Sequence, residues 1–282
     1  MAGVCDATPL NEKFYKNVSF SPFTRKNIRQ RTDPETALKG ARALIVVGVP
    51  WLESAICSDS TPDETASLGV LSSLGALADY HPRVVFVLRE LVDKLGGGFR
   101  HKILVDSGGL DERAFAVRAG LGVYGRHGLV ISPTWGTRFN IGLLVVDAEC
   151  ETSPAQAFDP GCADCGRCIK ACPTGALAFT HTRVYTVERC ISYLTQKEGL
   201  SPEEAAMLGN QLYGCDLCQD ACPYNARLRG APRGKTYVNP ARWLAMTDED
   251  FARVYGHTGM LWRGAEVLRR NARAVLQNLN GL

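Results

Sequence analysis

Cysteine is the residue type in this sequence whose number and spacing point most directly to chemistry. The chain has eleven cysteines, and eight of them lie between residues 162 and 222. The first run consists of Cys162, Cys165, Cys168 and Cys172, followed directly by Pro173. This C-x2-C-x2-C-x3-C-P spacing is the one with which bacterial ferredoxins bind 4Fe–4S clusters. Paired C-x2-C motifs also bind zinc, but four cysteines in one tight run before a proline favour iron–sulfur chemistry.

A second, incomplete run of the same motif consists of Cys215, Cys218, Cys222 and Pro223. Leu212 occupies the position at which this pattern would place its first cysteine. Cys190 lies between the two runs, and we expect it to supply the missing ligand. If Cys190 is not a ligand, the second cluster should be a 3Fe–4S or labile species.

In the crossed topology of two-cluster ferredoxins, the last cysteine of each run binds the cluster of the other run. This topology assigns Cys162, Cys165, Cys168 and Cys222 to the first cluster. It assigns Cys172, Cys190, Cys215 and Cys218 to the second. Two 4Fe–4S clusters in one chain indicate an electron-transfer or redox protein.

The remaining features predict a soluble cytoplasmic protein. The first twenty residues have neither an apolar core nor a basic start, so we expect no signal peptide. The longest apolar run, residues 43–52, is about half of what a membrane helix needs. A chain without an export signal is not expected to use its cysteines in disulfides. The three outside the array, Cys5, Cys57 and Cys150, are expected to be small packing residues.

The 282 residues are 45% hydrophobic and carry a net charge of +3, which is enough for one large domain or two smaller ones. We expect an α+β protein: an α/β domain over residues 1–150, a ferredoxin-like two-cluster domain over 151–225, and a helical segment over 226–282. The last segment has ten Lys or Arg against four Asp or Glu. This excess of positive charge indicates either a surface that binds an anionic partner or a helix face exposed to solvent.

The strands and helices of the first domain must position the group that receives electrons from the clusters. Apolar runs predict strands at 43–49, 103–105, 129–131 and 141–146. Helical spacing predicts helices at 65–78, 83–95 and 111–119. A last helix is predicted at 264–278, carrying Arg269, Arg270 and Arg273.

Asp106 is the candidate catalytic residue of this domain. It follows a predicted strand, at the kind of strand end where α/β folds open their ligand crevices. The alternative is an ordinary turn residue. Glu112 and Arg113 on the next predicted helix fit a surface pair, and His127 fits a loop or packing residue better than a metal ligand.

Several longer stretches resemble the epoxyqueuosine reductase family, cobalamin-dependent iron–sulfur enzymes of queuosine tRNA modification. The resemblance runs from about Arg31 to Asn278. Its most specific stretches are "CGRCIKACPTGAL", "RCISYLTQKEG", which begins just before Cys190, and "GNQLYGCDLCQDACPYN". Further matches are "DYH" at residues 79–81, "VDSG…ER" at 105–113 and "AGLGVYGRHGL" from residue 119.

The resemblance implies a cofactor, a substrate and roles for several residues. Cobalamin would lie between the α/β domain and the clusters, which would reduce it, and the substrate would be an epoxide on a nucleoside of a tRNA anticodon. Asp106 matches the proton-donor position of the family. The cobalamin contacts would include Arg31, Ser72, Asp106, Val130, Ile141 and Ser192. A low-potential donor such as ferredoxin or flavodoxin would supply electrons to a monomer, and residues 226–282 would be the shortened start of the family's helical repeats.

Two other functions remain open from the sequence. One is a related cobalamin and iron–sulfur reductase with a different substrate, since reductive dehalogenases share this architecture. The other is a non-catalytic two-cluster electron-transfer protein, in which the first domain would be a docking module. Cobalamin binding would separate the last from the other two.

Overall fold

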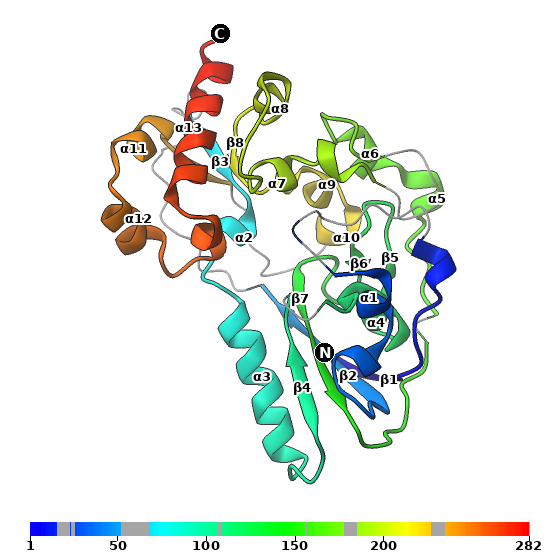
Figure 1. Cartoon of the computed structure of the whole chain (residues 1–282). Helices are drawn as coiled ribbons and strands as arrows, with labels where there is room; N and C mark the ends of the chain where they lie inside the picture. The colour runs from blue at the N-terminus through cyan, green and yellow to red at the C-terminus, as the bar shows by residue number, and fades with distance from the viewer. Residues whose placement is uncertain are drawn as a thin grey trace.

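The computed structural model describes residues 1–15, 23, 26–51, 68–106, 109–155, 157–177, 185–226 and 235–281. A sheet-containing part and a mainly helical part meet near the middle of the molecule, with the C-terminus at the far end of the helical part (Figure 1). None of the helices in these ranges is both long enough and apolar enough to cross a membrane.

The larger sheet has four strands in the order β1-β2-β7-β4. They are β1 (Ala2–Asp6), β2 (Ala43–Pro50), β7 (Phe139–Val146) and β4 (His101–Leu104). All three neighbouring pairs are antiparallel, and the central pair places Ala43 opposite Val146. The expected strands at 43–49, 103–105 and 141–146 are therefore present, and β4, which precedes Asp106, pairs with β7 in an antiparallel sheet.

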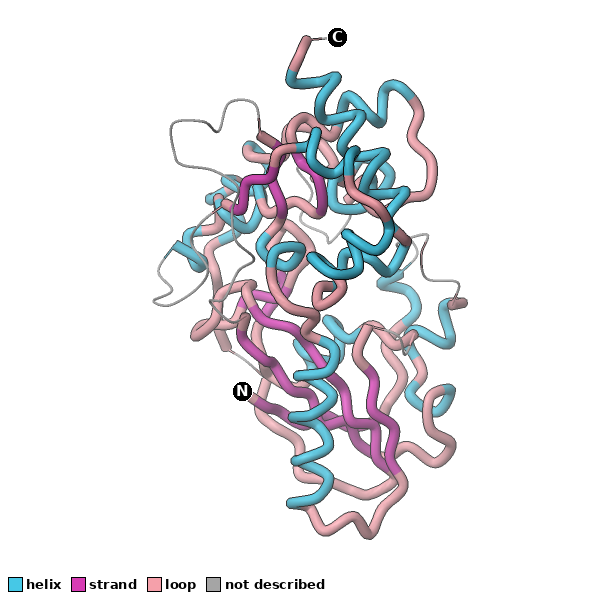
Figure 2. Tube along the Cα trace, turned by 90° about the vertical axis from the view of Figure 1, so that its left-hand side faces the viewer, coloured by secondary structure: helices cyan, strands magenta, loops and turns pink. Residues whose placement is uncertain are grey.

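Helices cover both faces of this sheet, which explains why β2 is apolar at nearly every position (Figure 2). Helix α3 (His81–Lys94) packs Val84 and Leu88 against one face of β2. Helix α4 (Glu112–Arg118) packs Phe115 against the other face. Successive strand residues point to opposite faces, so Leu44 belongs to the core beneath α4, whereas Ile45 belongs to the core beneath α3. The helices expected at 83–95 and 111–119 are confirmed.

A second sheet joins the parts of the sequence that were assigned to separate domains. Its order is β8 (Gln211–Tyr213), β3 (Gly69–Leu71) and β9 (Thr236–Val238). Strand β3 runs parallel to β8 and antiparallel to β9. One strand each comes from the ranges 1–150, 151–225 and 226–282, so these three ranges are interleaved in space.

The expectation of a helix over residues 65–78 was wrong where the structure describes this stretch, from residue 68 onward. Strand β3 is followed by a single helical turn, α2 (Ser73–Ala76), capped by Ser72. Gly69 makes the close pairing possible, because a Cβ there would stand 2.3 Å from the Leu212 side chain. A small residue at position 69 lets two strands pair closely. The spacing of apolar residues along the chain does not indicate such a contact.

The helical part contains short elements around the cysteines and longer ones beyond them. The cysteine-bearing part has α5 (Cys162–Cys165), α6 (Arg167–Lys170), η4 (Val187–Arg189), α7 (Ile191–Leu194), α8 (Pro202–Met207), α9 (Leu217–Asp220) and α10 (Pro223–Ala226). Beyond it lie α11 (Pro240–Ala245), α12 (Asp248–Tyr255), η5 (Gly259–Arg263) and α13 (Ala265–Leu279). The last agrees with the expected helix at 264–278.

The remaining elements support the sheet part. They are η1 (Glu12–Tyr15), α1 (Ile28–Thr32), η2 (Pro34–Thr36) and the hairpin of β5 (Val123–Tyr124) with β6 (Val130–Ile131). The hairpin contains the strand expected at 129–131. Its connecting loop carries Arg126 and His127 toward the cysteines.

Candidate iron–sulfur centres and the neighbouring carboxyl site

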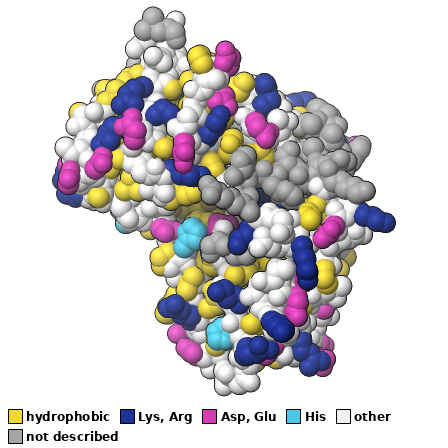
Figure 3. Space-filling view, viewed as in Figure 1, with side chains coloured by type: hydrophobic (Ala, Val, Ile, Leu, Met, Phe, Trp, Pro, Cys, Tyr) yellow, Lys and Arg dark blue, Asp and Glu magenta, His cyan; other side chains and the backbone are white. Residues whose placement is uncertain are grey.

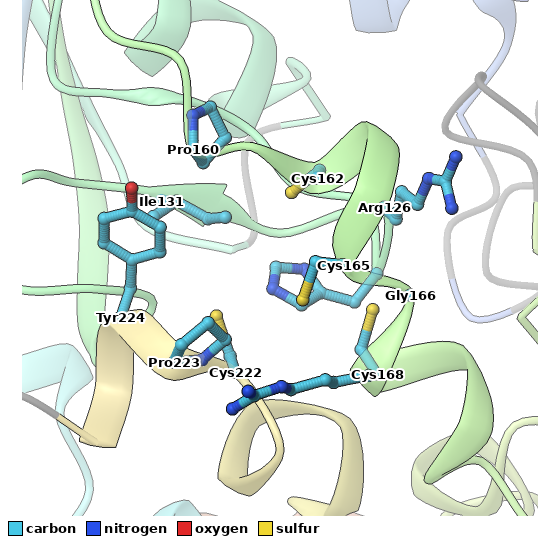
Figure 4. A pocket seen from close by; sticks show the side chains of 12 residues that line it. Arg126, Ile131, Pro160, Cys162, Cys165, Gly166, Cys168, Cys222, Pro223 and Tyr224 are labelled. Atoms are coloured by element: carbon cyan, nitrogen blue, oxygen red, sulfur yellow. The ribbon is translucent and has the colours of Figure 1, made fainter.

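Four of the predicted ligands line one pocket in the helical part (Figure 4). They are Cys162, Cys165, Cys168 and Cys222. Gly166 joins α5 to α6 at φ 60°, a left-handed conformation that glycine adopts without strain. This turn brings the first three cysteines around a common space, and Cys222 enters it from the second run.

The other four predicted ligands, Cys172, Cys190, Cys215 and Cys218, form a second set. Burial raises the pKa of Cys215 to about 12, and the neighbouring thiols of Cys190 and Cys172 add to the rise. Burial also raises the pKa of Cys218, with further contributions from Cys215 and Cys190. Cys168 of the first set contributes to the Cys218 pKa as well. Because such effects require short distances, the two sets adjoin each other.

Two adjoining groups of four thiols are the donor set that two 4Fe–4S clusters require. In the described part of the chain, no three His, Cys, Asp or Glu side chains stand close enough together for a single metal ion. The ligands of a cube are distributed over four irons, so they stand further apart than the ligands of one ion. The raised thiol pKa values mean that cluster binding must release protons.

Backbone amides prepare Cys172 for an anionic role. Burial opposes its ionisation, but amide donors from Leu177 and Ala176, together with the hydroxyl and amide of Thr174, outweigh that effect and lower its pKa. Thr174 in turn donates its hydroxyl to the carbonyl of Arg189 at 2.6 Å, and Arg189 Nε donates to the Thr174 carbonyl at 2.6 Å. This reciprocal pair fixes the loop after Cys172 against the segment that leads to Cys190.

Asp106 lies just beyond β4 with φ 51°. Its amide donates to Glu112 Oε1 at 2.6 Å, and the Tyr80 hydroxyl donates to its carboxylate. His81 Nε2 stands 3.9 Å from Asp106 Oδ2, and His81 Nδ1 is 2.6 Å from Asp79 Oδ1. The residues 79–81 and 112 therefore surround Asp106 with groups that can hold protons.

The carboxyls of Asp106 and Glu112 both favour the protonated form. Burial is the largest cause of the raised pKa of Asp106. Burial and then the charge of Asp106 raise the pKa of Glu112 well above its ordinary value. Protonated Glu112 can donate to the Asp106 carboxylate, so the pair can share one proton. The Asp106 side chain is 57% exposed, but surrounding protein atoms still desolvate it enough to raise its pKa.

Arg113 connects this carboxyl pair to the second cysteine set. Its guanidinium donates to the Gly128 carbonyl at 3.0 Å. Its positive charge lowers the pKa values of Asp106, Glu112 and Cys190. A group that affects all three lies near each of them. Glu112 is half-buried and Arg113 is exposed, so the expected surface pair is present, and both residues also influence the pKa of Asp106.

Two of the residues implied as cobalamin contacts lie near residues already described, Arg31 near Arg113 in space and Ser192 near Cys190 along the chain. Arg113 and Tyr185 are close enough to Arg31 to affect its pKa. The backbone carbonyl of Arg31 accepts the amide hydrogen of Asp111 at 2.9 Å. Ser192 lies on α7, two residues after Cys190. Sequence reasoning missed Tyr185, whose place near Arg113 depends on the fold.

The three other implied contacts lie elsewhere on the walls or in the core. Ser72 lines a hollow together with Asp216 and Arg138. Its amide donates to the Tyr213 carbonyl at 2.8 Å. Val130 is 3% exposed and belongs to the core beneath α4, and Ile141 packs against the same core. Any contact they make with a cofactor would use backbone atoms.

The cysteines outside the array have no part in these sites where they are described. Cys5 is buried against Phe115, and burial raises its pKa to about 12. Cys150 is half-buried near the carbonyl of Ala148. Cys57 lies outside the described residues.

Comparisons with known proteins agree with this geometry. Residues 161–225 match the family described as "4Fe-4S double cluster binding domain". The epoxyqueuosine reductase of Lactococcus garvieae is 33% identical over 92% of this chain and 76% of its own length. That of Bacillus subtilis is 30% identical over 89% of this chain and 67% of its own length.

Solved structures of epoxyqueuosine reductases are also similar to this chain. Epoxyqueuosine reductase from Streptococcus thermophilus superposes with a TM-score of 0.86 at 30% identity, covering 99% of this chain and 77% of that one. An epoxyqueuosine reductase in complex with an epoxyqueuosine-modified tRNA-Tyr stem loop also has a TM-score of 0.86, at 27% identity and the same coverage.

Proposed function

This chain belongs to the epoxyqueuosine reductase family, and we propose on that premise that it is a cobalamin-dependent iron–sulfur reductase that converts epoxyqueuosine to queuosine in tRNA. Its relatives carry this name, and one related structure contains the modified stem loop. The reaction converts an epoxide to an alkene and water, and it consumes two electrons and two protons. The chain must therefore supply an electron path, a proton donor and a binding site for the nucleoside.

The observation that supports the proposal is the set of contacts around Asp106. Its carboxylate accepts the Tyr80 hydroxyl, its amide donates to Glu112, and the charge of Arg113 affects the pKa values of both Asp106 and Cys190. A carboxyl with a raised pKa keeps its proton to a higher pH than an ordinary aspartate does, and it can give that proton to the departing epoxide oxygen. Asp106 is thus the proposed general acid, and Glu112 holds a proton next to it.

Cobalamin, when bound, supplies a cobalt centre that passes electrons to the epoxide. It would bind between Asp106, the proposed proton donor, and the second cysteine set, the proposed electron source. Arg31 and Ser192 would contact the cofactor there, with Ser72 further along the wall. The backbones of Val130 and Ile141 are proposed to complete the site.

Electrons are proposed to enter at the first cluster and leave from the second. Arg126 and Arg167 line the pocket of the first set, and Arg167 and Lys170 are exposed. Such a rim fits an acidic, low-potential carrier such as ferredoxin or flavodoxin, since complementary charge speeds association. The second set lies next to the proposed cobalamin site, so the crossed ligands give the electrons a short path.

The tRNA partner requires a surface for phosphates. On the face shown in Figure 3, basic and acidic side chains are interspersed over the helical part. Each arginine of the expected cluster on α13 has an intramolecular partner: Arg269 bonds Asp248, Arg270 bonds the Leu194 carbonyl, and Arg273 bonds Glu266. Phosphate binding by these residues would have to replace such contacts. We propose a cytoplasmic monomer, as expected of an enzyme that modifies tRNA.

The test is an anaerobic turnover assay. The chain is reconstituted with iron and sulfide, supplied with cobalamin and a low-potential reductant, and incubated with a stem loop that carries epoxyqueuosine. Digestion and mass spectrometry should detect queuosine, and the yield should depend on cobalamin. Asp106→Asn should lose the product, whereas Asp93→Asn, at the opposite end of α3 from His81, should retain it.

Two outcomes would contradict the proposal. Protein that holds both clusters and cobalamin but forms no queuosine would be a corrin reductase with another substrate. Protein that holds both clusters but does not bind cobalamin would be a two-cluster electron carrier.

A further inference from the structure

His127 is a buried histidine, and one of its ring nitrogens has no hydrogen-bond partner in the described part of the chain. It lies in the loop between β5 and β6, and only 6% of its surface is exposed. Nδ1 accepts the amide hydrogen of Leu129 at 3.1 Å. Nε2 is buried and has no hydrogen-bond partner among the described residues. Buried polar groups are normally bonded, so a lone nitrogen at this depth calls for a partner that protein atoms do not supply.

The protonation state of the ring follows from its surroundings. Burial is the main cause that lowers the pKa of His127 to about 4, and the charge of Arg113 adds to it. The ring is therefore neutral at physiological pH. Because Nδ1 accepts a hydrogen bond, the single ring proton is on Nε2. The atom without a partner is thus an N–H donor.

The same side chain lines the pocket of the first cysteine set. His127 forms part of its wall together with Cys162, Cys165, Cys168 and Cys222. Its ring fits closely over Gly125, where a Cβ would stand 2.5 Å from His127 Cε1 and 3.0 Å from Nε2. Any larger residue at 125 would displace the ring. The backbone thus fixes a neutral N–H donor at the edge of the space that the first cluster would fill.

We propose that His127 Nε2–H donates a hydrogen bond to a sulfur atom of the first cluster and thereby raises the reduction potential of that cluster. Reduction adds one electron and one negative charge to the cluster. A hydrogen-bond donor stabilises the more negative form more strongly, because bonds to charged acceptors are the stronger ones. Hydrogen bonds to sulfur are among the factors that set cluster potentials. His127 would then make the first cluster easier to reduce than it would be without this donor.

This inference rests on the cluster assignment within the proposed function but not on cobalamin or tRNA. Its test therefore omits both. The reconstituted full chain is titrated with a chemical reductant at controlled potential, and each cluster is followed by EPR. Failure of the tRNA or cobalamin proposals would leave the result of this titration unchanged.

His127→Phe removes the donor and keeps a ring, and His127→Gln restores an N–H group in a similar place. We expect His127→Phe to lower the potential of the first cluster, with about a tenfold loss in its reduced-to-oxidised ratio at a fixed potential, which equals about 59 mV for one electron. His127→Gln should recover part of the shift. The second cluster, and the control variant His101→Gln on exposed β4, should keep the wild-type values. An unchanged potential in a His127→Phe protein with full cluster content would overturn the proposal.

A second measurement decides the matter if His127→Phe does not assemble its first cluster. The wild-type chain is labelled with 15N-histidine, and the reduced cluster is examined by pulsed EPR. A 15N coupling that disappears in His127→Gln would support the hydrogen bond. The absence of any histidine coupling in the wild-type spectrum would refute it.

Discussion

The backbone amide of Asp106 donates a 2.6 Å hydrogen bond to Glu112 Oε1, although Asp106 adopts a left-handed φ of 51°. Aspartate is one of the few residues that tolerates this conformation. The bond anchors the turn after β4 to the start of α4. The same contact places two carboxyls together. Burial is the largest cause of the raised pKa of Glu112, the charge of Asp106 adds to it, and the amide hydrogen bond opposes it.

The first prediction concerns the pH dependence of turnover. Asp106 acts as an acid with a raised pKa, so kcat should fall as pH rises through that pKa. Asp106→Asn should reduce kcat by about 10²–10⁴, the usual contribution of a general acid. The measurement is a single-turnover rate across pH 5 to 9, with Asp93→Asn as the control. A wild-type rate that rises steadily with pH would argue against the donor role.

Glu112 gives a prediction for stability. Its folded pKa is raised, so the folded chain retains a proton that the unfolded chain releases as pH rises above the ordinary carboxyl range. Wild-type stability should therefore decline as pH increases toward the raised pKa. Glu112→Gln removes this loss and should raise the melting temperature at pH 8 by about 2–4 °C, which corresponds to ~1 kcal/mol in a chain of this size. Near pH 4 the two proteins should melt alike. An equal difference at both pH values would mean that titration of Glu112 is not the cause.

His81 is predicted to return a proton to Asp106. Its Nε2 is 3.9 Å from the carboxylate, and its Nδ1 is held by Asp79 at 2.6 Å. His81→Gln should slow multiple turnover by about tenfold, at the low end of what proton-transfer groups contribute, with a smaller effect on the first turnover. His101→Gln is the matched control. Equal losses in the first and later turnovers would indicate a role in binding or positioning instead.

Cys190 is predicted to be the fourth ligand of the second cluster. Cys190→Ser should convert that cluster to a 3Fe–4S form or lose it, so that the iron content falls below the roughly eight atoms that two 4Fe–4S clusters require. EPR of the oxidised protein would show the change, because a 3Fe–4S cluster has its own signal. Cys150→Ser should leave both clusters intact. Full iron content in Cys190→Ser, with unchanged spectra, would exclude Cys190 as a ligand.

Asn271 is predicted to stabilise the packing of α13 against the rest of the helical part. It is fully buried, and its amide donates to the carbonyls of Thr195 and Leu212, each at 2.8 Å. Asn271→Ala would leave two buried carbonyls without these donors and should lower the free energy of unfolding by about 2–4 kcal/mol. Urea denaturation would measure this loss. Asn278→Ala, near the exposed end of the same helix, should have a smaller effect, and equal losses would mean that burial of the carbonyls is not decisive.

Local spacing was enough to predict the cysteine chemistry, because the ligands of each run are a few residues apart and a short loop must bring them together. It also predicted α3, whose apolar face packs on one layer, and β2, which is apolar at nearly every position because helices cover both faces of its sheet. The motifs before and after Cys190 carried the family resemblance, which the relatives and solved structures confirm. These features depend on residues close together in the chain.

The tertiary structure decided what depends on distant residues. Residues 69–71 form a strand because β8 and β9, more than 130 residues away, pair with them. Asp106 was singled out because it follows a predicted strand, whereas its surroundings come from Tyr80, His81 and Glu112. The burial of His127 likewise follows from packing beside the first cysteine set. Spacing cannot reveal such contacts, because burial and electrostatic coupling depend on distances in space rather than along the chain.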